Sequence, residues 1–142
     1  RFPNVIGPDL THGVIFDFLK KVKKNSKILL VLGNGEQKKP YLYVDDLINI
    51  ILKILTLKKI SNNFDIFNIS PSDNGIKVAE IASLFKNILY PDIKIKYSSK
   101  NNFGWKGDVP SYQFDTIKIN SKGIHPSYTS RESVIKTLLK YK

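Results

Sequence analysis

Hydrophobic positions along the chain fall into segments with helical spacing and shorter apolar runs. In the first kind, apolar residues recur every three or four positions with polar residues, largely lysine, between them, which predicts helices with one face in a core. These segments cover residues 13–24, 47–55, 76–89, 115–122 and 134–139. The shorter runs predict strands. They cover residues 2–6, 28–32, 41–44, 64–69 and 93–97.

Two of these segments also predict how deeply they are buried. Residues 28–32 are all apolar without alternation and end at Gly33 and Gly35, so we expect a strand covered on both faces and then a tight turn. Asp45 and Asp46 stand where acidic side chains cap and favour a helix N-terminus. The helix that they open is apolar nearly all round, and we expect it to be buried.

Strands that alternate with helices predict an α/β layered fold with at least partly parallel strands. No internal repeat and no linker divides the 142 residues, so a single domain is expected. Thr129 and Glu132 form a capping box that predicts the start of the last helix. The segment 98–110 is a long loop and holds the only tryptophan, which is typical of a functional or flexible segment.

The composition of the chain excludes several classes of protein and of site. An apolar content of 42% excludes a disordered chain, and the absence of cysteine excludes disulfides, thiolate metal sites and a thiol nucleophile. The net charge is +11, but all of the cationic residues except Arg1 and Arg131 are lysines spread along the chain, which does not predict a nucleic-acid site. Apolar stretches are too short to span a bilayer. We expect a soluble, cytoplasmic protein that binds no metal, nucleic acid or membrane.

Three polar loops next to predicted strands are candidate ligand sites: Asn4 with Gly7 and Pro8, the turn at residues 33–39, and residues 103–112. Features of the last two have simpler explanations. Gly33 and Gly35 suit a tight turn better than a phosphate loop. The neighbouring Lys38 and Lys39 either meet an anion or are solvated. Trp105 either anchors its loop on the core or offers a surface for stacking.

Taken in order, several segments resemble one family. They are RFPNVIGPDL, GVIFDFLKK, VLGNGEQKKPYLYVDDL, FNIS, GWKGDVP with Tyr112, and FDTIK followed by GIHP. Together they resemble the C-terminal half of the NAD-dependent nucleotide-sugar epimerases and dehydratases, which are extended short-chain dehydrogenases, and especially the UDP-glucose 4-epimerase-like group. The resemblance implies that residues 1–142 form the C-terminal substrate-binding part of an extended Rossmann-type fold, with the last sheet strands and a small mixed lobe.

The same resemblance implies where the chemistry lies. In that family the nucleotide-binding glycine motif and the catalytic Tyr-x-x-x-Lys pair precede the Asn-Val-x-Gly-Pro segment, so we expect no catalytic residue in this chain. NAD would be bound mainly by an N-terminal part that we expect to be missing, because the chain opens at Arg1 without an initiator methionine. The isolated chain should then be inactive, with a nucleotide sugar, a missing Rossmann half or a second copy as its partners. The alternative is a catalytically silent nucleotide-sugar-binding or interaction module.

The resemblance also assigns roles to the first part of the chain. Pro3 matches a residue that touches the nicotinamide end of NAD, and Asn4 matches one whose amide binds the substrate diphosphate. Gly13 and Val14 stand where the substrate-covering helix begins, whose N-terminal amides suit a phosphate. The segment that matches the backbone reading the edge of uracil consists of Leu30, Val31 and Leu32.

Roles in the second part of the chain depart more from the family pattern. Lys39 matches a phosphate-binding position that is usually Arg, and Lys keeps the charge but loses the fork. Trp105 stands where a second phosphate-binding Arg is common, and a Trp there offers stacking in place of charge. Asp108 and Tyr112 match residues that contact the ribose or a phosphate. The two histidines match no catalytic position, and we interpret both as turn or surface residues. They are His12 and His125.

Overall fold

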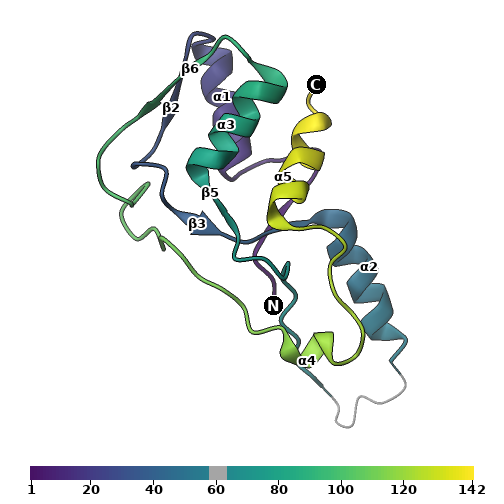
Figure 1. Cartoon of the computed structure of the whole chain (residues 1–142). Helices are drawn as coiled ribbons and strands as arrows, with labels where there is room; N and C mark the ends of the chain where they lie inside the picture. The colour runs from purple at the N-terminus through teal and green to yellow at the C-terminus, as the bar shows by residue number, and fades with distance from the viewer. Residues whose placement is uncertain (58–63) are drawn as a thin grey trace.

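The computed structural model describes residues 1–57 and 64–142 (Figure 1). Its helices are α1 (Val14–Lys24), α2 (Val44–Leu55), α3 (Val78–Leu89), α4 (Ile117–Asn120) and α5 (Ser130–Leu139). Its strands are β1 (Asn4–Ile6), β2 (Ile28–Val31), β3 (Lys38–Lys39), β4 (Tyr41–Tyr43), β5 (Ile76–Lys77) and β6 (Lys94–Tyr97). The predicted α/β class is confirmed.

Within the described residues the strands pair two by two. β1 pairs with β4 and β2 pairs with β6, both in parallel, whereas β3 pairs with β5 in antiparallel fashion. Parallel neighbours need a crossover connection, and α3 lies on the one that joins β2 to β6. The prediction of partly parallel strands is therefore confirmed.

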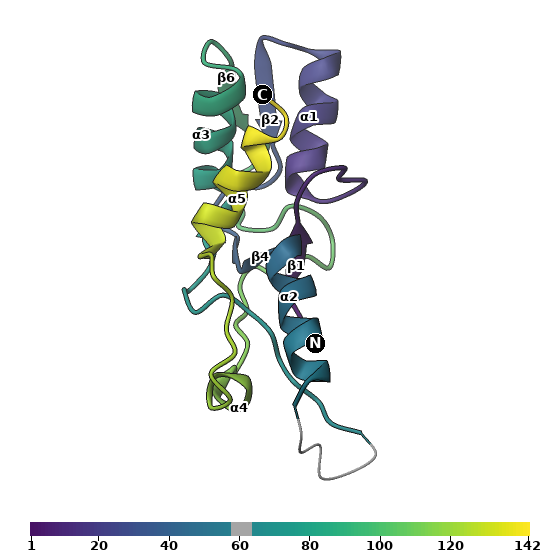
Figure 2. The ribbon, with the colours of Figure 1, turned by 90° about the vertical axis from the view of Figure 1, so that its right-hand side faces the viewer.

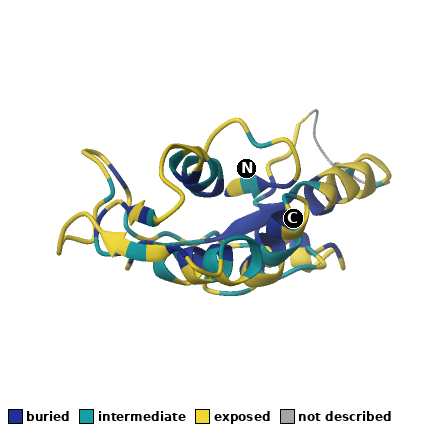
Figure 3. Cartoon of the chain, turned by 90° about the horizontal axis from the view of Figure 1, so that it is seen from above, coloured by how far each residue is buried: buried dark blue, intermediate teal, exposed yellow. Residues whose placement is uncertain are grey.

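The molecule is elongated, with different elements at its two ends. In Figures 1 and 2, α1 and α3 lie beside β2 and β6 at one end, and α2 and α4 lie toward the other. β1 and β4 lie between these ends (Figure 2). Figure 3 shows buried residues concentrated along the middle of the molecule and exposed ones along the outer loops and helices.

Strand β4 separates two clusters of buried side chains. Its Tyr41 belongs to the cluster that includes Phe18 of α1 and Phe85 of α3, whereas Leu42 belongs to the cluster that includes Ile50 of α2. Successive residues of a strand point to opposite faces, so β4 supplies both clusters and all three of its residues are buried. β4, rather than β2, is the strand covered on both faces.

The prediction for residues 28–32 was right about the strand and wrong about its burial. Leu29 and Val31 are fully buried, but Leu30 and Leu32 alternate with them and are exposed to 43% and 39%. β2 has β6 beside it and α1 against one face, which leaves the other face open. An apolar run alone does not say whether a second layer covers it.

The prediction that the second helix is buried was also wrong in this structure. α2 buries Leu47 and Ile50 but exposes a row of large apolar side chains. These are Ile48, Ile51, Leu52 and Leu55.

Smaller boundaries differ as well. Residues 64–69 form no regular strand. Their backbone contacts that of Arg1, which accepts from Ile69 and donates through its amino group to the carbonyl of Phe67. The helix predicted from residue 76 begins at Val78, since Ile76 is drawn into the pairing of β5 with β3.

Two acidic side chains hold the last helix against the rest of the chain. Asp46, which we predicted as a helix cap, lies inside the first turn of α2 and accepts from the backbone amides of Ser127 and Tyr128 at 2.9 and 3.0 Å. Asp73 accepts from the backbone amide and the hydroxyl of Ser130 at 2.7 and 2.6 Å. Both carboxylates satisfy amides at the entry to α5, which fixes that helix beside β4.

The capping box of α5 is confirmed and carries a testable consequence. Thr129 Oγ1 accepts from the amide of Glu132, and the Glu132 carboxylate accepts from the amide of Thr129. Thr129→Ala should lower the free energy of unfolding by about 1 kcal/mol, because one N-terminal amide loses its acceptor. Urea unfolding of the variant measures this, and Thr129→Ser, which keeps the hydroxyl, should unfold like the parent. Equal losses in both variants would contradict a role for the cap.

Among the described residues, no helix is both long and apolar enough to cross a membrane. Within the same residues, no group of three or more His, Asp and Glu side chains is placed to hold a metal ion.

Candidate functional site

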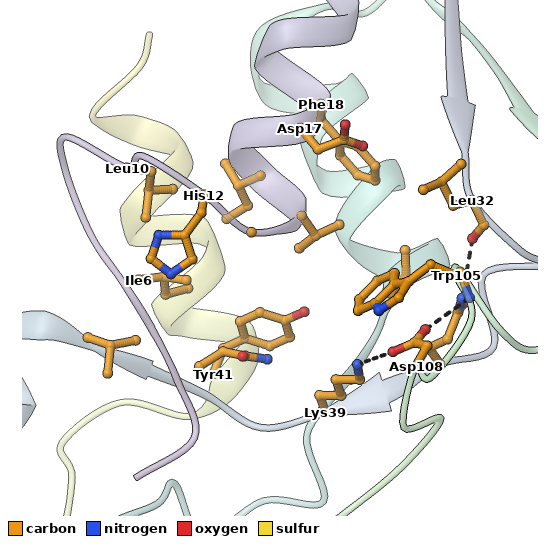
Figure 4. A pocket seen from close by; sticks show the side chains of 18 residues that line it. Ile6, Leu10, His12, Asp17, Phe18, Leu32, Lys39, Tyr41, Trp105 and Asp108 are labelled. Atoms are coloured by element: carbon orange, nitrogen blue, oxygen red, sulfur yellow. Dashed lines mark hydrogen bonds and ion pairs between the residues drawn. The ribbon is translucent and has the colours of Figure 1, made fainter.

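A cavity of about 430 Å³ lies where the N-terminal segment, α1, the 32–41 segment and the 98–110 loop meet. Figure 4 shows Tyr41 and Lys39 at one end of it, His12 and Leu10 along one side, and Trp105 and Leu32 along the other. The cavity is lined by seven of the residues that the sequence assigned to substrate. They are Asn4, Gly13, Val14, Leu32, Lys39, Trp105 and Asp108.

An ion pair closes one wall of the cavity. Lys39 Nζ donates to Asp108 Oδ1 at 2.6 Å, and the two side chains are only 13% and 1% exposed. The other carboxylate oxygen accepts from the amide of Gly104 at 2.9 Å. Asp108 is therefore held from both sides, and Lys39 has a protein anion as its partner.

Trp105 stands above this pair. Its ring lies 5.1 Å from Lys39 Nζ, within the range of a cation–π contact, yet the side chain is 61% exposed. The ring is thus not packed into the core, and of the two explanations left open for Trp105, an anchor buried in the core does not describe it.

Backbone hydrogen bonds hold the 98–110 loop against the turn at residues 33–38. Asn34 donates to the carbonyl of Asn101 at 2.8 Å, and Lys38 donates to the carbonyl of Pro110 at 2.7 Å. A Cβ on Gly33 would stand 2.7 Å from the carbonyl oxygen of Phe103, so the approach of the loop requires glycine there. This contact fixes the loop that carries Trp105 and Asp108.

Tyr41 is a cavity residue that the sequence analysis missed. Burial raises the pKa of its hydroxyl well above the ordinary value, Tyr112 and Asp108 add to the rise, and a hydrogen bond with the Asn4 side chain opposes it. The hydroxyl therefore stays protonated and is available as a hydrogen-bond donor. Its place in an apolar strand suggested only a core residue.

The first turn of α1 opens onto the cavity. Gly13 precedes the helix with a φ of 88°, and no side chain caps its first amides. The loop before it is tied to the C-terminal segment, because the amide of Leu10 donates to the Tyr141 hydroxyl at 2.9 Å. His12, which we interpreted as a surface residue, is exposed but also lines the cavity.

Four predicted site residues do not line the cavity: Pro3, Leu30, Val31 and Tyr112. Tyr112 lies close by, within reach of Asn4 and Tyr41. Val31 is buried in the core, and Leu30 faces outward.

The backbone of residues 30–32, expected to read a base edge, is partly engaged by the protein. The carbonyls of Leu30 and Val31 accept from Lys21 and from the amide of Ser98, both at 2.9 Å. The carbonyl of Leu32 accepts from Gln37 at 3.3 Å. Of the three residues, Leu32 is the one in contact with the cavity.

Pro3, the one residue expected at the cofactor, is buried outside the cavity. The spacing Tyr-x-x-x-Lys does occur once, at Tyr90 and Lys94, but Tyr90 ends α3 and Lys94 begins β6, so the two are not neighbours on one helix. A catalytic pair is therefore not assembled there.

Comparisons with known proteins bear on the family and the fold of the chain. The sequence profile of the NAD dependent epimerase/dehydratase family matches residues 1–70. No curated protein matches the chain.

Solved structures match almost the whole chain. A UDP-galactose 4-epimerase has a TM-score of 0.81 and 30% identity over 99% of this chain and 43% of its own. The UDP-glucose 4-epimerase of the hyperthermophile Thermotoga maritima, crystallised with UDP-glucose, has a TM-score of 0.74 and 27% identity over 99% and 44%. A dTDP-glucose 4,6-dehydratase of Bacillus anthracis, in complex with NAD, has a TM-score of 0.76 and 20% identity over 99% and 43%, and shows the fold alone.

The 142 residues therefore span less than half the length of these structures and correspond to their C-terminal half. The sequence resemblance is confirmed: the chain is similar to the NAD-dependent epimerase/dehydratase family in sequence over residues 1–70 and in fold over 99% of its length.

Proposed function

We propose that these residues bind the nucleotide half of a nucleotide sugar, most simply a UDP-sugar, as the substrate-binding part of an NAD-dependent epimerase or dehydratase. One observation carries the proposal. Residues from four separate segments, chosen from the sequence as substrate contacts, converge on one cavity of about 430 Å³. The size falls within the range of small-molecule sites.

Each wall of the cavity offers a different kind of contact. Asn4 and Tyr41 supply an amide and a protonated hydroxyl, which suit the oxygens of a sugar or a phosphate. Trp105 offers a ring face for a base or a ribose. The amides of Gly13 and Val14 at the start of α1 suit a phosphate.

Under the same proposal, the chemical step takes place at NAD and the sugar, and not at the residues of this cavity. NAD, when bound, takes a hydride from the sugar and returns it. The residues of this chain hold and orient the nucleotide, and residues 1–142 form the substrate-binding portion as one unit. UDP-sugar epimerase structures at 27% and 30% identity support the UDP-sugar as the substrate class.

Trp105 provides both the reporter and the test. It is the only tryptophan and borders the cavity, so UDP binding should change its fluorescence. Trp105→Ala should weaken UDP by about 1 to 3 kcal/mol, because stacking of a base on an aromatic ring contributes about that much.

Calorimetry measures the affinity of this variant, which has no tryptophan signal. Phe103→Ala, which removes another exposed aromatic ring of the same loop outside the cavity, is the matched control and should bind UDP normally. If UDP and UDP-glucose leave the fluorescence unchanged and release no heat with the folded chain, the proposed function is wrong.

A further inference from the structure

The cavity offers few positive charges to a ligand that carries phosphates. Among the described residues that line it, only Lys39 and His12 have side chains that can be cationic. Lys39 is already in an ion pair with Asp108 at 2.6 Å, so part of its charge is compensated. Trp105 supplies an aromatic ring without charge, and its neighbour Lys106 is exposed and does not line the cavity. His12 is therefore the remaining source of positive charge on the described walls.

His12 lies directly beside the amides that the proposed function gives to a phosphate. It comes immediately before Gly13, and no side chain caps the first amides of α1. A helix N-terminus carries a partial positive charge, which disfavours a nearby cation and favours an anion. A bound phosphate would therefore interact favourably with both the amides of α1 and a protonated His12.

The His12 ring can be accommodated in either protonation state. Its Nδ1 lies 3.2 Å from Thr11 Oγ1, and a hydroxyl can accept a hydrogen bond as well as donate one. The side chain is exposed, and within the described residues the ring makes no other hydrogen bond. Figure 4 shows it at the side of the cavity opposite Trp105. Its Nε2 is thus available to donate to a ligand oxygen.

Other ionisable side chains near the ring come from its own loop and from the elements around the cavity. They are Asp9 in the same loop, Asp17 in α1, Tyr141 after α5, and Tyr41, Lys39 and Asp108 across the cavity. Asp17 and Asp108 each accept from a lysine at 2.6 Å, and none of the described ion pairs includes His12. Carboxyl, phenol and ammonium side chains ordinarily titrate outside the range from about pH 6 to about pH 8, in which imidazole titrates.

We infer that His12, in its protonated form, is a further contact for the phosphates of the nucleotide sugar, so that binding strengthens as the pH falls and imidazole becomes charged. The inference rests on the proposed function and deepens it, because it adds a residue and a pH dependence to the same site. By linkage, binding of the anion and protonation of His12 favour each other, so the complex should take up protons as it forms.

Titration of the full 142-residue chain with UDP-glucose at about pH 8 and about pH 6 tests this. UDP-glucose is preferred to UDP, because a terminal phosphate itself titrates near about pH 6. The affinity should rise about three- to fivefold at the lower pH, and His12→Gln should abolish that rise. His125→Gln, which removes the other histidine at an exposed position outside the cavity, is the matched control and should keep it. Uridine, which has no phosphate, should bind equally at both pH values.

A second measurement needs no variant. Calorimetry at about pH 7 in two buffers with different enthalpies of ionisation should show net uptake of protons when UDP-glucose binds the parent chain, and none when uridine binds.

The outcomes separate the inference from the function on which it rests. An affinity for UDP-glucose that is equal at the two pH values, without proton uptake, overturns the inference and leaves nucleotide binding intact. A rise at the lower pH that persists in folded His12→Gln also overturns it, since another group would then be responsible. Binding of neither UDP-glucose nor uridine at either pH contradicts the proposed function, and the inference fails with it.

Discussion

Lys39→Ala should lower the free energy of unfolding by about 3 kcal/mol, the low end of the cost of breaking a buried ion pair. The loss is large because the Asp108 side chain is 1% exposed and would lose its ion-pair partner. It stays at the low end because Gly104 still donates to the carboxylate. Urea unfolding at neutral pH measures the change.

Lys38→Ala is the matched control. Lys38 is the neighbour of Lys39 in β3, and no ion pair to its side chain occurs among the described residues. Its loss should change stability by less than about 0.5 kcal/mol. The double variant Lys39→Ala with Asp108→Asn should recover part of the lost stability, because the unpaired charge is gone.

UDP affinity should also fall in Lys39→Ala and stay close to that of the parent chain in Lys38→Ala. In Lys39→Ala the uncompensated Asp108 carboxylate would repel the phosphates, so UDP should weaken by about one to two decades and uridine by less. Affinities are measured under conditions in which the variant is folded. Equal UDP affinities for Lys39→Ala, Lys38→Ala and the parent chain would show that Lys39 does not border the ligand.

Much of the fold could be predicted because it depends on local pattern. In the helices at 14–24 and 78–89, apolar residues recur at helical spacing throughout. The capping box of α5 can be recognised from Thr129 and Glu132 in the sequence. Burial could not be predicted in the same way, because it depends on which helices and strands pack against each other. Leu30 and the exposed apolar side chains of α2 are of the same residue types as the core. No helix or strand among the described residues covers them.

The candidate site could be predicted in part, and only through the resemblance. Spacing alone does not bring Lys39 to Asp108, because 69 positions separate them in the sequence. The resemblance assigned both residues to the ligand, and in the structure they also pair with each other. Tyr41 was missed because an apolar strand hides a hydroxyl that faces a cavity.

Gly75 links the backbone of the fold to this site. It has a φ of 78°, and a Cβ on it would lie 2.5 Å from the carbonyl carbon and oxygen of Lys39. The tight approach of residue 75 to β3 thus sets where the Lys39 backbone lies. A side chain there meets backbone atoms, which cannot rotate away.

Gly75→Ala should therefore lower the free energy of unfolding by about 2 to 5 kcal/mol. About 1 to 2 kcal/mol comes from the left-handed conformation and about 1 to 3 kcal/mol from overpacking against β3. Gly123→Ala is the matched control, because Gly123 has a φ of 69° but no atom within 4 Å of its Cβ position, so only the first cost applies.

Thermal and urea unfolding of the two variants separate strain from overpacking. A second readout tests the link to the site: in folded Gly75→Ala the displaced Lys39 should reach Asp108 less well, so UDP affinity should change, whereas Gly123→Ala should bind UDP like the parent chain. Equal destabilisation by the two substitutions, with UDP binding unaltered in both, would contradict this. It would mean that β3 moves to make room for the new Cβ without loss of stability and that Gly75 does not position Lys39.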